Sequence, residues 1–224
     1  IDLEAALADI YNNIGTVEFI DTIKAILALL ETARPVGRPR SFEDFELIFQ
    51  SFVLPEYYNL YDDDDHFSEM RVTGINPMVI KQVSNLEGHF PVTEAIFTAT
   101  AEFANDSLAA AGSEGRLFLA DYEMLSIMEP GALPTQPKYV YAPLALFALP
   151  KNGNKLKPIA IQCNQDSSTN PIFTPNDGWT WKIAKAAMQV ADTNHHELYS
   201  HLGTTHLVQE AIALGTYRQL SYRH

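Results

Sequence analysis

The sequence predicts a mainly α-helical fold in which a small antiparallel β subdomain, at about 139–163, precedes one long helix at about 179–220. Apolar residues recur at helical spacing through several stretches of the chain. Two β-like runs, Tyr139–Leu149 and Leu156–Cys163, flank an Asn-Gly dipeptide that is typical of a hairpin. The amphipathic segment from Trp181 to Leu220 carries the expected long helix.

Composition limits the classes of function. The 224 residues suffice for one sizeable core or for part of a larger one, and 46% hydrophobic with 19% charged residues is ordinary for a globular protein. The net charge of −13 argues against nucleic acid and anionic lipid surfaces, because both require basic patches. A fatty acid remains compatible, since it binds mainly through apolar burial. No uninterrupted apolar stretch is long enough for a transmembrane helix.

Cys163 is the only cysteine, so no intrachain disulfide can form and the redox compartment is undetermined. The first residue is Ile1 and not Met, so we expect an upstream leader or domain to be missing from this sequence. A cytoplasmic location is the default expectation, with a secreted or periplasmic location as the alternative.

The first part of the chain reads as helices. Residues from Ile1 to Thr32 mix apolar and acidic residues in a helical rhythm, and a second helix is expected between Ser41 and Pro55. Its aromatic and aliphatic residues keep helical spacing, and core packing is favoured for them over a substrate wall: Phe42, Phe45, Ile48, Phe49 and Phe52.

The acidic run Asp62–Asp65 could suggest calcium, but it lacks the alternating ligands and the glycine of a calcium loop. A solvated segment or a helix N-terminus is therefore favoured. A Gly-Ile-Asn-Pro turn follows at residues 74–77, and an alanine-rich helix is expected over Thr93–Ala111, closed by Gly112 and Gly115.

The segment Asn164–Gly178 is polar and rich in turn residues, which predicts a loop before the long helix.

Three histidines in the last helix are spaced by five: His196, His201 and His206. Imidazole is the commonest transition-metal ligand in proteins, so this series suggests a metal site. In a regular α-helix, however, residues five apart point about 140° away from each other. Two neighbouring histidines can converge on one ion only if the helix widens into a π-bulge, so the spacing predicts a metal and a distortion together.

The residues around these histidines resemble the iron-binding helix of the lipoxygenases. The positions that carry the resemblance are Trp181, Ala184, Lys185, Asp192, His196, His201, Thr205, His206, Glu210, Arg218, Gln219 and Leu220. The Gly-x-Asn-Pro turn and the hairpin are similar to the family as well. Residues Arg116–Tyr122 resemble the family's short strand that ends in Asp-Tyr, so the resemblance predicts a strand there. In the hairpin the matching residues are Tyr141, Ala142, Leu146, Phe147, Leu156, Lys157, Pro158, Ile159, Ala160 and Ile161.

The resemblance implies a non-haem iron dioxygenase that forms hydroperoxides from polyunsaturated fatty acids and O₂. In the family, ferric iron with a bound hydroxide removes a hydrogen, and O₂ traps the resulting radical. Carried over by position, His201 and His206 would bind the iron, and His196 would lie close by without binding it. Glu197 stands where Gln is most common, and Leu202 is the residue type of animal members. Both are substrate-pocket candidates, and Glu197 is expected to point elsewhere or to have a partner.

The remaining iron ligands of the family are a His, an Asn or His, and the C-terminal carboxylate, all from further downstream. This sequence ends at His224, where the family continues. We therefore expect two ligands here, no normal oxygenase turnover by this chain alone, and a downstream half of the catalytic domain as its partner. The expected parts of the partial domain are N-terminal helices at 1–60, a helical part with the Gly-x-Asn-Pro turn at 61–138, the hairpin and loop at 139–178, and the iron-ligand helix at 179–224.

Three functional classes stay open. The first is a segment of an iron lipoxygenase that is active when completed. The second is a catalytically inactive, lipoxygenase-like protein or fragment that acts as a structural or binding module. The third, an unrelated zinc hydrolase, is the weakest, because the residue four after His196 is Ser200 and not a histidine. The alternative to all three is a helix whose histidines bind no metal.

Overall fold

The computed structural model describes residues 21, 23–25, 53–133 and 136–222. The chain divides into two compact units, Ile1–Tyr58 and Asn59–His224, and the second holds nearly all of the described residues. The helices expected before residue 53 lie outside the described residues, except for Asp21 and residues 23–25, which are helical.

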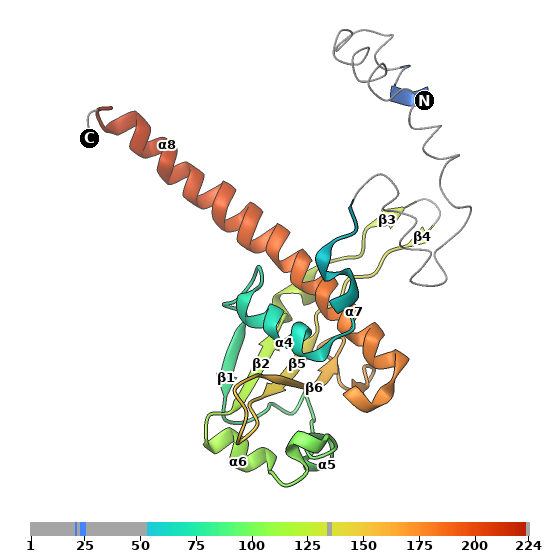
Figure 1. Cartoon of the computed structure of the whole chain (residues 1–224). Coiled ribbons are helices and arrows are strands. Elements are labelled where there is room, and N and C mark those ends of the chain that lie inside the picture. The colour runs from blue at the N-terminus through green and yellow to red at the C-terminus, as the bar shows by residue number, and fades with distance from the viewer. Residues whose placement is uncertain (1–20, 22, 26–52, 134–135, 223–224) are drawn as a thin grey trace. The chain divides into compact units, whose positions relative to one another are not determined.

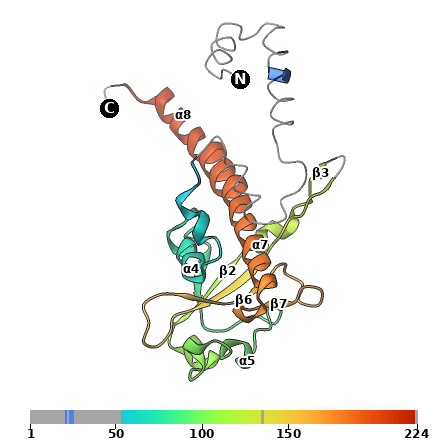
Figure 2. The ribbon, with the colours of Figure 1, turned by 45° about the vertical axis from the view of Figure 1, so that its right-hand side comes forward.

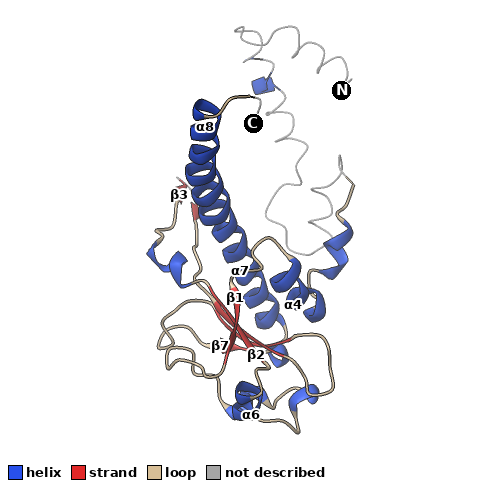
Figure 3. Ribbon diagram, turned by 90° about the vertical axis from the view of Figure 1, so that its left-hand side faces the viewer, coloured by secondary structure: helices blue, strands red, loops and turns tan. Residues whose placement is uncertain are grey.

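A five-stranded, fully antiparallel sheet is the centre of the second unit, with strand order β1-β2-β5-β6-β7 (Figure 3). The strands are β1 (Ile80–Val83), β2 (Leu117–Asp121), β5 (Leu144–Ala148), β6 (Lys157–Gln162) and β7 (Ile172–Phe173). The β5–β6 pair confirms the predicted hairpin, and β2 confirms the predicted short strand. A separate two-stranded ribbon pairs β3 (Ala132–Leu133) with β4 (Gln136–Pro137).

One long helix, in three consecutive segments, crosses the sheet and continues in line beyond it (Figures 1 and 2). These are α7 (Trp179–His195), the π-helical segment η6 (His196–Gln209) and α8 (Glu210–Gln219). The other helical elements are short: η2 (Glu56–Leu60), α4 (Asp64–Thr73), α5 (Glu94–Phe97), η3 (Ala101–Phe103), α6 (Leu108–Ser113), η4 (Glu123–Ile127) and η5 (Pro175–Asp177). Among the described residues, no helix is both long and apolar enough to span a membrane.

Strand β5 is buried on both faces, so the sheet lies between two layers of core. Successive side chains of a strand point to opposite faces. Ala145 and Phe147 accordingly pack with α4 and α7, whereas Leu144 and Leu146 pack with α5, η3 and α6. A register shift between β5 and β6 at Leu146/Phe147 places two successive β6 residues in the second layer.

The helix expected over Thr93–Ala111 is wrong as one element, because the segment folds into α5, η3 and α6. Thr93 and Ser107 each accept a hydrogen bond from a main-chain N–H three residues on, and each starts a new helical turn. Side-chain capping therefore prevails over the helix propensity of the alanines. The predicted end is confirmed: Gly115 has φ +72°, and Arg116 N–H donates to Ala111 O at 2.8 Å.

The acidic run is a helix N-terminus that anchors α4 to α7. Asp63 caps α4 by accepting from His66 N–H at 2.6 Å. The Lys185 ammonium, only 3% exposed, contacts Asp64 Oδ1 at 2.7 Å, and Trp181 Nε1 donates to the same carboxylate at 2.9 Å. These partners explain the acidic run as a structural anchor.

Phe67 joins α4, the sheet and α7, and we predict a large loss of stability for Phe67→Ala. Its ring is 2% exposed and lies 5.8 Å from the Phe147 ring and 6.4 Å from the Trp181 ring. Removing it should lower the free energy of unfolding by about 3–5 kcal/mol in urea titrations. Tyr139→Ala, at a site that is 67% exposed, is the control and should cost less than about 0.5 kcal/mol. Equal losses in both variants would contradict this account of the core.

Candidate metal centre on the long helix

Hydrogen bonds from threonine side chains show the π geometry of η6 directly. In α-helical segments the hydroxyls of Thr193 and Thr216 donate to the carbonyl four residues back. In η6 the hydroxyls of Thr204 and Thr205 donate to the carbonyl five residues back, both at 3.1 Å. Each turn of this segment therefore holds more residues than an α-helical turn. The expected distortion is confirmed, and it extends over 14 residues.

The wider turn brings His201 and His206 together. Their Nε2 atoms lie 2.9 Å apart, and their ring centroids lie 4.7 Å apart. Ring nitrogens bind transition metals at about 2.0–2.1 Å, so two nitrogens on one ion lie about 3 Å from each other. The separation of the two Nε2 atoms thus fits a shared ion.

A carboxylate holds each of these rings from its other nitrogen. Glu197 Oε2 lies 3.0 Å from His201 Nδ1, and Glu210 Oε1 lies 2.7 Å from His206 Nδ1. A carboxylate on Nδ1 favours the tautomer in which Nδ1 carries the proton and Nε2 presents its lone pair. The bond to His201 lowers the pKa of the Glu197 carboxyl, so this carboxylate stays ionised.

The arrangement suits a cation between the two rings. When both Nδ1–H groups donate to carboxylates, two Nε2 lone pairs face each other at 2.9 Å. They repel each other unless a proton or a metal ion lies between them, and two imidazoles suit a first-row transition metal such as iron. Across the described residues there is no group of three or more His, Cys, Asp or Glu side chains that could hold a metal.

The other candidates of the series lie close to this pair. The His196 ring stacks on the His201 ring with centroids 6.0 Å apart, and its Nδ1 is buried without a hydrogen-bond partner in the described structure. Glu197 contacts the His201 ring, as described, so of the two expected outcomes, pointing elsewhere or having a partner, it has a partner. Leu202 is 47% exposed on η6, next to the first of the two histidines. No residue of η6 is buried, so the face that bears the pair is open.

A buried polar network fixes α7 near the point where it meets η6. The Arg71 guanidinium lies 3.2 Å from Asp192 Oδ2, and both side chains are almost fully buried. The Tyr122 hydroxyl donates to Asp192 Oδ1 at 2.6 Å, and burial raises the pKa of this hydroxyl, so it remains protonated. Asn76 Nδ2 donates to the same Oδ1 at 2.7 Å. Three elements remote in sequence therefore hold one carboxylate of the helix.

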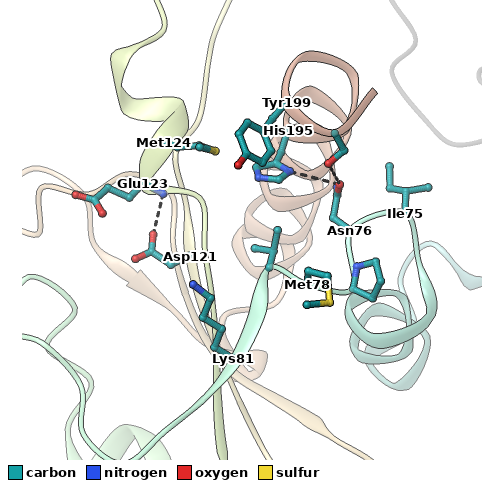
Figure 4. A pocket seen from close by; sticks show the side chains of 12 residues that line it. Ile75, Asn76, Met78, Lys81, Asp121, Glu123, Met124, His195 and Tyr199 are labelled. Atoms are coloured by element: carbon teal, nitrogen blue, oxygen red, sulfur yellow. Dashed lines mark hydrogen bonds between the residues drawn. The ribbon is translucent and has the colours of Figure 1, made fainter. Parts of the chain in front are cut away.

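An open groove of about 530 Å³ is lined in part by Asn76, a member of this network (Figure 4). Its walls are mixed, with Met78, Met124 and Tyr199 as apolar residues and Lys81 and Asp121 as charged residues. His201 and His206 are not among its lining residues. The groove and the histidine pair are therefore separate features of the helix.

Reasoning from the sequence missed the two carboxylates as orienting groups and Asn76 as a contact of the helix. Glu197 and Glu210 each lie four residues from the histidine they contact, a spacing that places side chains on one helical face. That spacing was a usable signal. Nothing in the local sequence marks the contact between Asn76 and Asp192, because 116 residues separate them.

Comparisons with known proteins identify the family of the chain. The lipoxygenase family model matches residues 47–224. The chain is 40% identical over 198 residues to the linoleate 9/13-lipoxygenase of Pseudomonas aeruginosa, covering 84% of this chain and 29% of the relative. It is 33% identical over 193 residues to human polyunsaturated fatty acid lipoxygenase ALOX15B, covering 84% of this chain and 28% of the relative.

Solved structures show the same fold. A calcium-dependent 11R-lipoxygenase superposes with a TM-score of 0.73 at 31% identity, over 82% of this chain and 28% of that chain. A LOX variant in complex with arachidonate superposes with a TM-score of 0.76 at 28% identity, over 99% of this chain and 32% of that chain. The fold and the helix with its π segment define a part of a lipoxygenase catalytic domain. The chain belongs to the lipoxygenase family, and it spans less than a third of the length of the curated relatives it matches.

Breaking the buried ion pair should be strongly destabilising. Asp192→Ala leaves the Arg71 guanidinium, 1% exposed, without its carboxylate, and should lower the free energy of unfolding by about 3–5 kcal/mol. The double variant R71M/D192L, which removes both charges, should recover most of that loss in urea titrations. Lys182→Met breaks an ion pair with Asp62 in which both side chains are about one-third exposed and, as the control, should cost far less than Asp192→Ala. A double variant as unstable as Asp192→Ala would refute the assignment of the loss to an unpaired charge.

His195 should make stability depend on pH. Burial lowers the pKa of His195 despite the nearby Asp192 carboxylate, so the folded state binds this proton less readily than the unfolded state does. Its contribution is full above the ordinary histidine pKa of about 6.5 and is lost as the pH falls below that value. Urea unfolding at pH 7.5 and 5.5 should therefore show a smaller acid loss for His195→Gln than for the unchanged chain. Equal losses would show that His195 is not the responsible group.

Proposed function

We propose that this chain supplies two ligands, His201 and His206, to the non-haem iron of a dioxygenase of polyunsaturated fatty acids. One observation carries the proposal: two carboxylate-held imidazoles direct their Nε2 atoms at one point, 2.9 Å apart, in a helix widened to bring them together. Membership of the lipoxygenase family supports iron as the metal and a fatty acid with O₂ as substrates.

The residues of the chain would divide the work as follows. His201 and His206 would hold the metal, while Glu197 and Glu210 fix their ring orientations and tautomers. When bound, the iron would supply the oxidising chemistry that removes a hydrogen from the fatty acid. Leu202 and Glu197 would face the substrate, and His196 would lie beside the metal, where its unpartnered Nδ1 is available for a hydrogen bond.

Completion of the site requires further ligands, which we propose come from a downstream half of the catalytic domain. Two imidazoles alone leave most coordination positions of an iron ion to water or other donors. Both histidine side chains are also almost half exposed, at 47% and 43%. The open face of η6 therefore supports a site assembled between this chain and a second segment.

The inactive alternative is supported by one specific observation, the absence of a third metal-binding side chain among the described residues near the pair. In that case the chain would bind metal weakly and act as a structural or binding module. The zinc hydrolase is disfavoured, because Glu197 is engaged by His201 and the Ser200 hydroxyl donates to Asn76 Oδ1 at 3.2 Å. Neither residue is free to activate a metal-bound water.

The test compares this chain alone with a chimera. In the chimera the chain continues into the part of the Pseudomonas aeruginosa relative that follows the matched region. Bound iron and manganese are measured by mass spectrometry, and O₂ uptake is measured with linoleate and with arachidonate. We expect iron and uptake in the chimera and neither at normal levels in the chain alone.

In the chimera, His201→Ala and His206→Ala should each reduce bound iron and O₂ uptake to below about a tenth, because loss of a ligand costs more than the 10- to 100-fold typical of its supporting groups. His89→Ala removes an imidazole that lies outside the long helix and should change neither quantity. An iron-free chimera without uptake would leave the inactive module as the better account.

A further inference from the structure

Asn76 stands in the turn that connects α4 to β1, and its side chain is buried against the long helix. Gly74 ends α4, and a Cβ there would lie 2.2 Å from Met70 O, so the turn requires glycine at this point. Val79 N–H donates to Asn76 O at 3.1 Å, which closes the turn. The turn thus presents the Asn76 amide, 7% exposed, to α7 and η6 (Figure 4).

The two ends of this amide contact the helix on either side of the change from α to π. Asn76 Nδ2 donates to Asp192 O and to Asp192 Oδ1, both at 2.7 Å. Asn76 Oδ1 accepts from Ser200 Oγ at 3.2 Å and lies 3.4 Å from His195 Nδ1. The α-helix ends at His195 and the π-helix begins at His196, between the two contact points.

The spacing of these contacts fits the observed register better than it fits a continuous α-helix. Asp192 and Ser200 are eight positions apart, whereas two α-helical turns bring together residues about seven apart. In a continuous α-helix the later residue would be rotated by about 80° from Asp192, away from the amide. One α turn followed by one wider turn accommodates the additional residue. The amide therefore matches a helix that changes from α to π at this point.

We propose that Asn76 is a positioning residue that sets where the long helix changes from α to π, and so sets the register in which His201 and His206 converge. A π-helix is rare and requires support from its surroundings, and Asn76 is a contact from outside the helix at the start of the π segment. If the helix reverted to α geometry, the two histidines would point about 140° apart. The consequence for metal binding rests on the proposed function, whereas the effect on the helix does not.

Metal-free hydrogen exchange tests the structural part in the full 224-residue chain. Asn76→Ala should speed exchange of the amides at 196–205 at least about tenfold relative to those of the sheet. Gln162→Ala is the matched control, because Gln162 is a buried amide whose Nε2 donates to two main-chain carbonyls, of His89 and Asn164, outside the long helix. Ser200→Ala removes only the far contact and should give a smaller change at the same amides.

Co²⁺ titration, followed by visible absorption, tests the register itself. In the unchanged chain, T205H/H206T moves the second imidazole to the i+4 position and should weaken Co²⁺ binding about tenfold or more. In the Asn76→Ala background the order should reverse. In the Asn76→Ala variant, the original pair His201 and His206 should bind Co²⁺ poorly. Adding T205H/H206T should restore Co²⁺ binding, because residues four apart share a face of an α-helix. A general loss of stability cannot produce this reversal.

The results test the positioning role of Asn76 and the proposed metal site separately. The positioning role is wrong if Asn76→Ala and Gln162→Ala give the same amide exchange rates at 196–205 and the same Co²⁺ affinity. If T205H/H206T weakens Co²⁺ binding equally in both backgrounds, it is also wrong. If Co²⁺ binding in the unchanged chain is insensitive to His201→Ala, the proposed metal site fails. The positioning role is then judged by the metal-free hydrogen exchange alone. Faster exchange at 196–205 than in the sheet in Asn76→Ala supports it, and no such difference overturns it.

Discussion

The rest of this structure depends on the buried ion pair between Arg71 and Asp192. A buried carboxylate is tolerated only when charged and hydrogen-bonding partners replace water, and Asp192 receives Arg71 on one oxygen and Tyr122 with Asn76 on the other. These partners come from α4, from the end of β2 and from the turn before β1, so they approach the helix from different directions. Together they fix both the rotation of α7 and its position along its axis. Every residue further along the helix, including the histidine pair, inherits that placement.

The sequence predicted features that are encoded locally. An Asn-Gly dipeptide between β-like runs predicts a hairpin, so β5 and β6 could be anticipated. Histidines five apart share one face only in a widened helix, so η6 could be anticipated as well. The break of Thr93–Ala111 into three pieces depends on capping by Thr93 and Ser107, which competes with alanine propensity and is decided by tertiary contacts. The candidate pair His201 and His206 could be found from its spacing in the sequence, whereas the residues that hold the helix in place could not. Asn76, Arg71 and Tyr122 reach Asp192 across large sequence separations that no periodic pattern reveals.

The long helix differs in character from the rest of the fold, and this difference bears on the proposed metal centre. Large apolar side chains on η6 and α8 are exposed, including Leu207 at 68% and Ile212 at 65%. A helix with apolar residues around its whole circumference is typical of the interior of a large domain. The sequence of this segment is therefore suited to burial on all sides, while α7 alone is covered by the described core. An open pair of imidazoles on such a helix agrees with a chain that spans less than a third of its relatives.

The π segment links the fold to the chemistry through a shared free energy. Backbone bonds from residue i to i+5 are unfavourable enough that long π-helices are rare, so η6 requires interactions that an α-helix in the same place would lack. The hydroxyls of Thr204 and Thr205 supply local ones, Asn76 supplies a long-range one, and a metal held by His201 and His206 would supply another. A ligand that binds only the π register stabilises that register by about 2.7 kcal/mol at a concentration 100 times its dissociation constant. A metal that requires the π register would bind more tightly the more that register is populated, so each contact that favours the register would also favour the metal. If His201 and His206 bind a metal as proposed, the buried network around Asp192 would contribute to its affinity through the register of the helix, although none of its side chains would touch the ion.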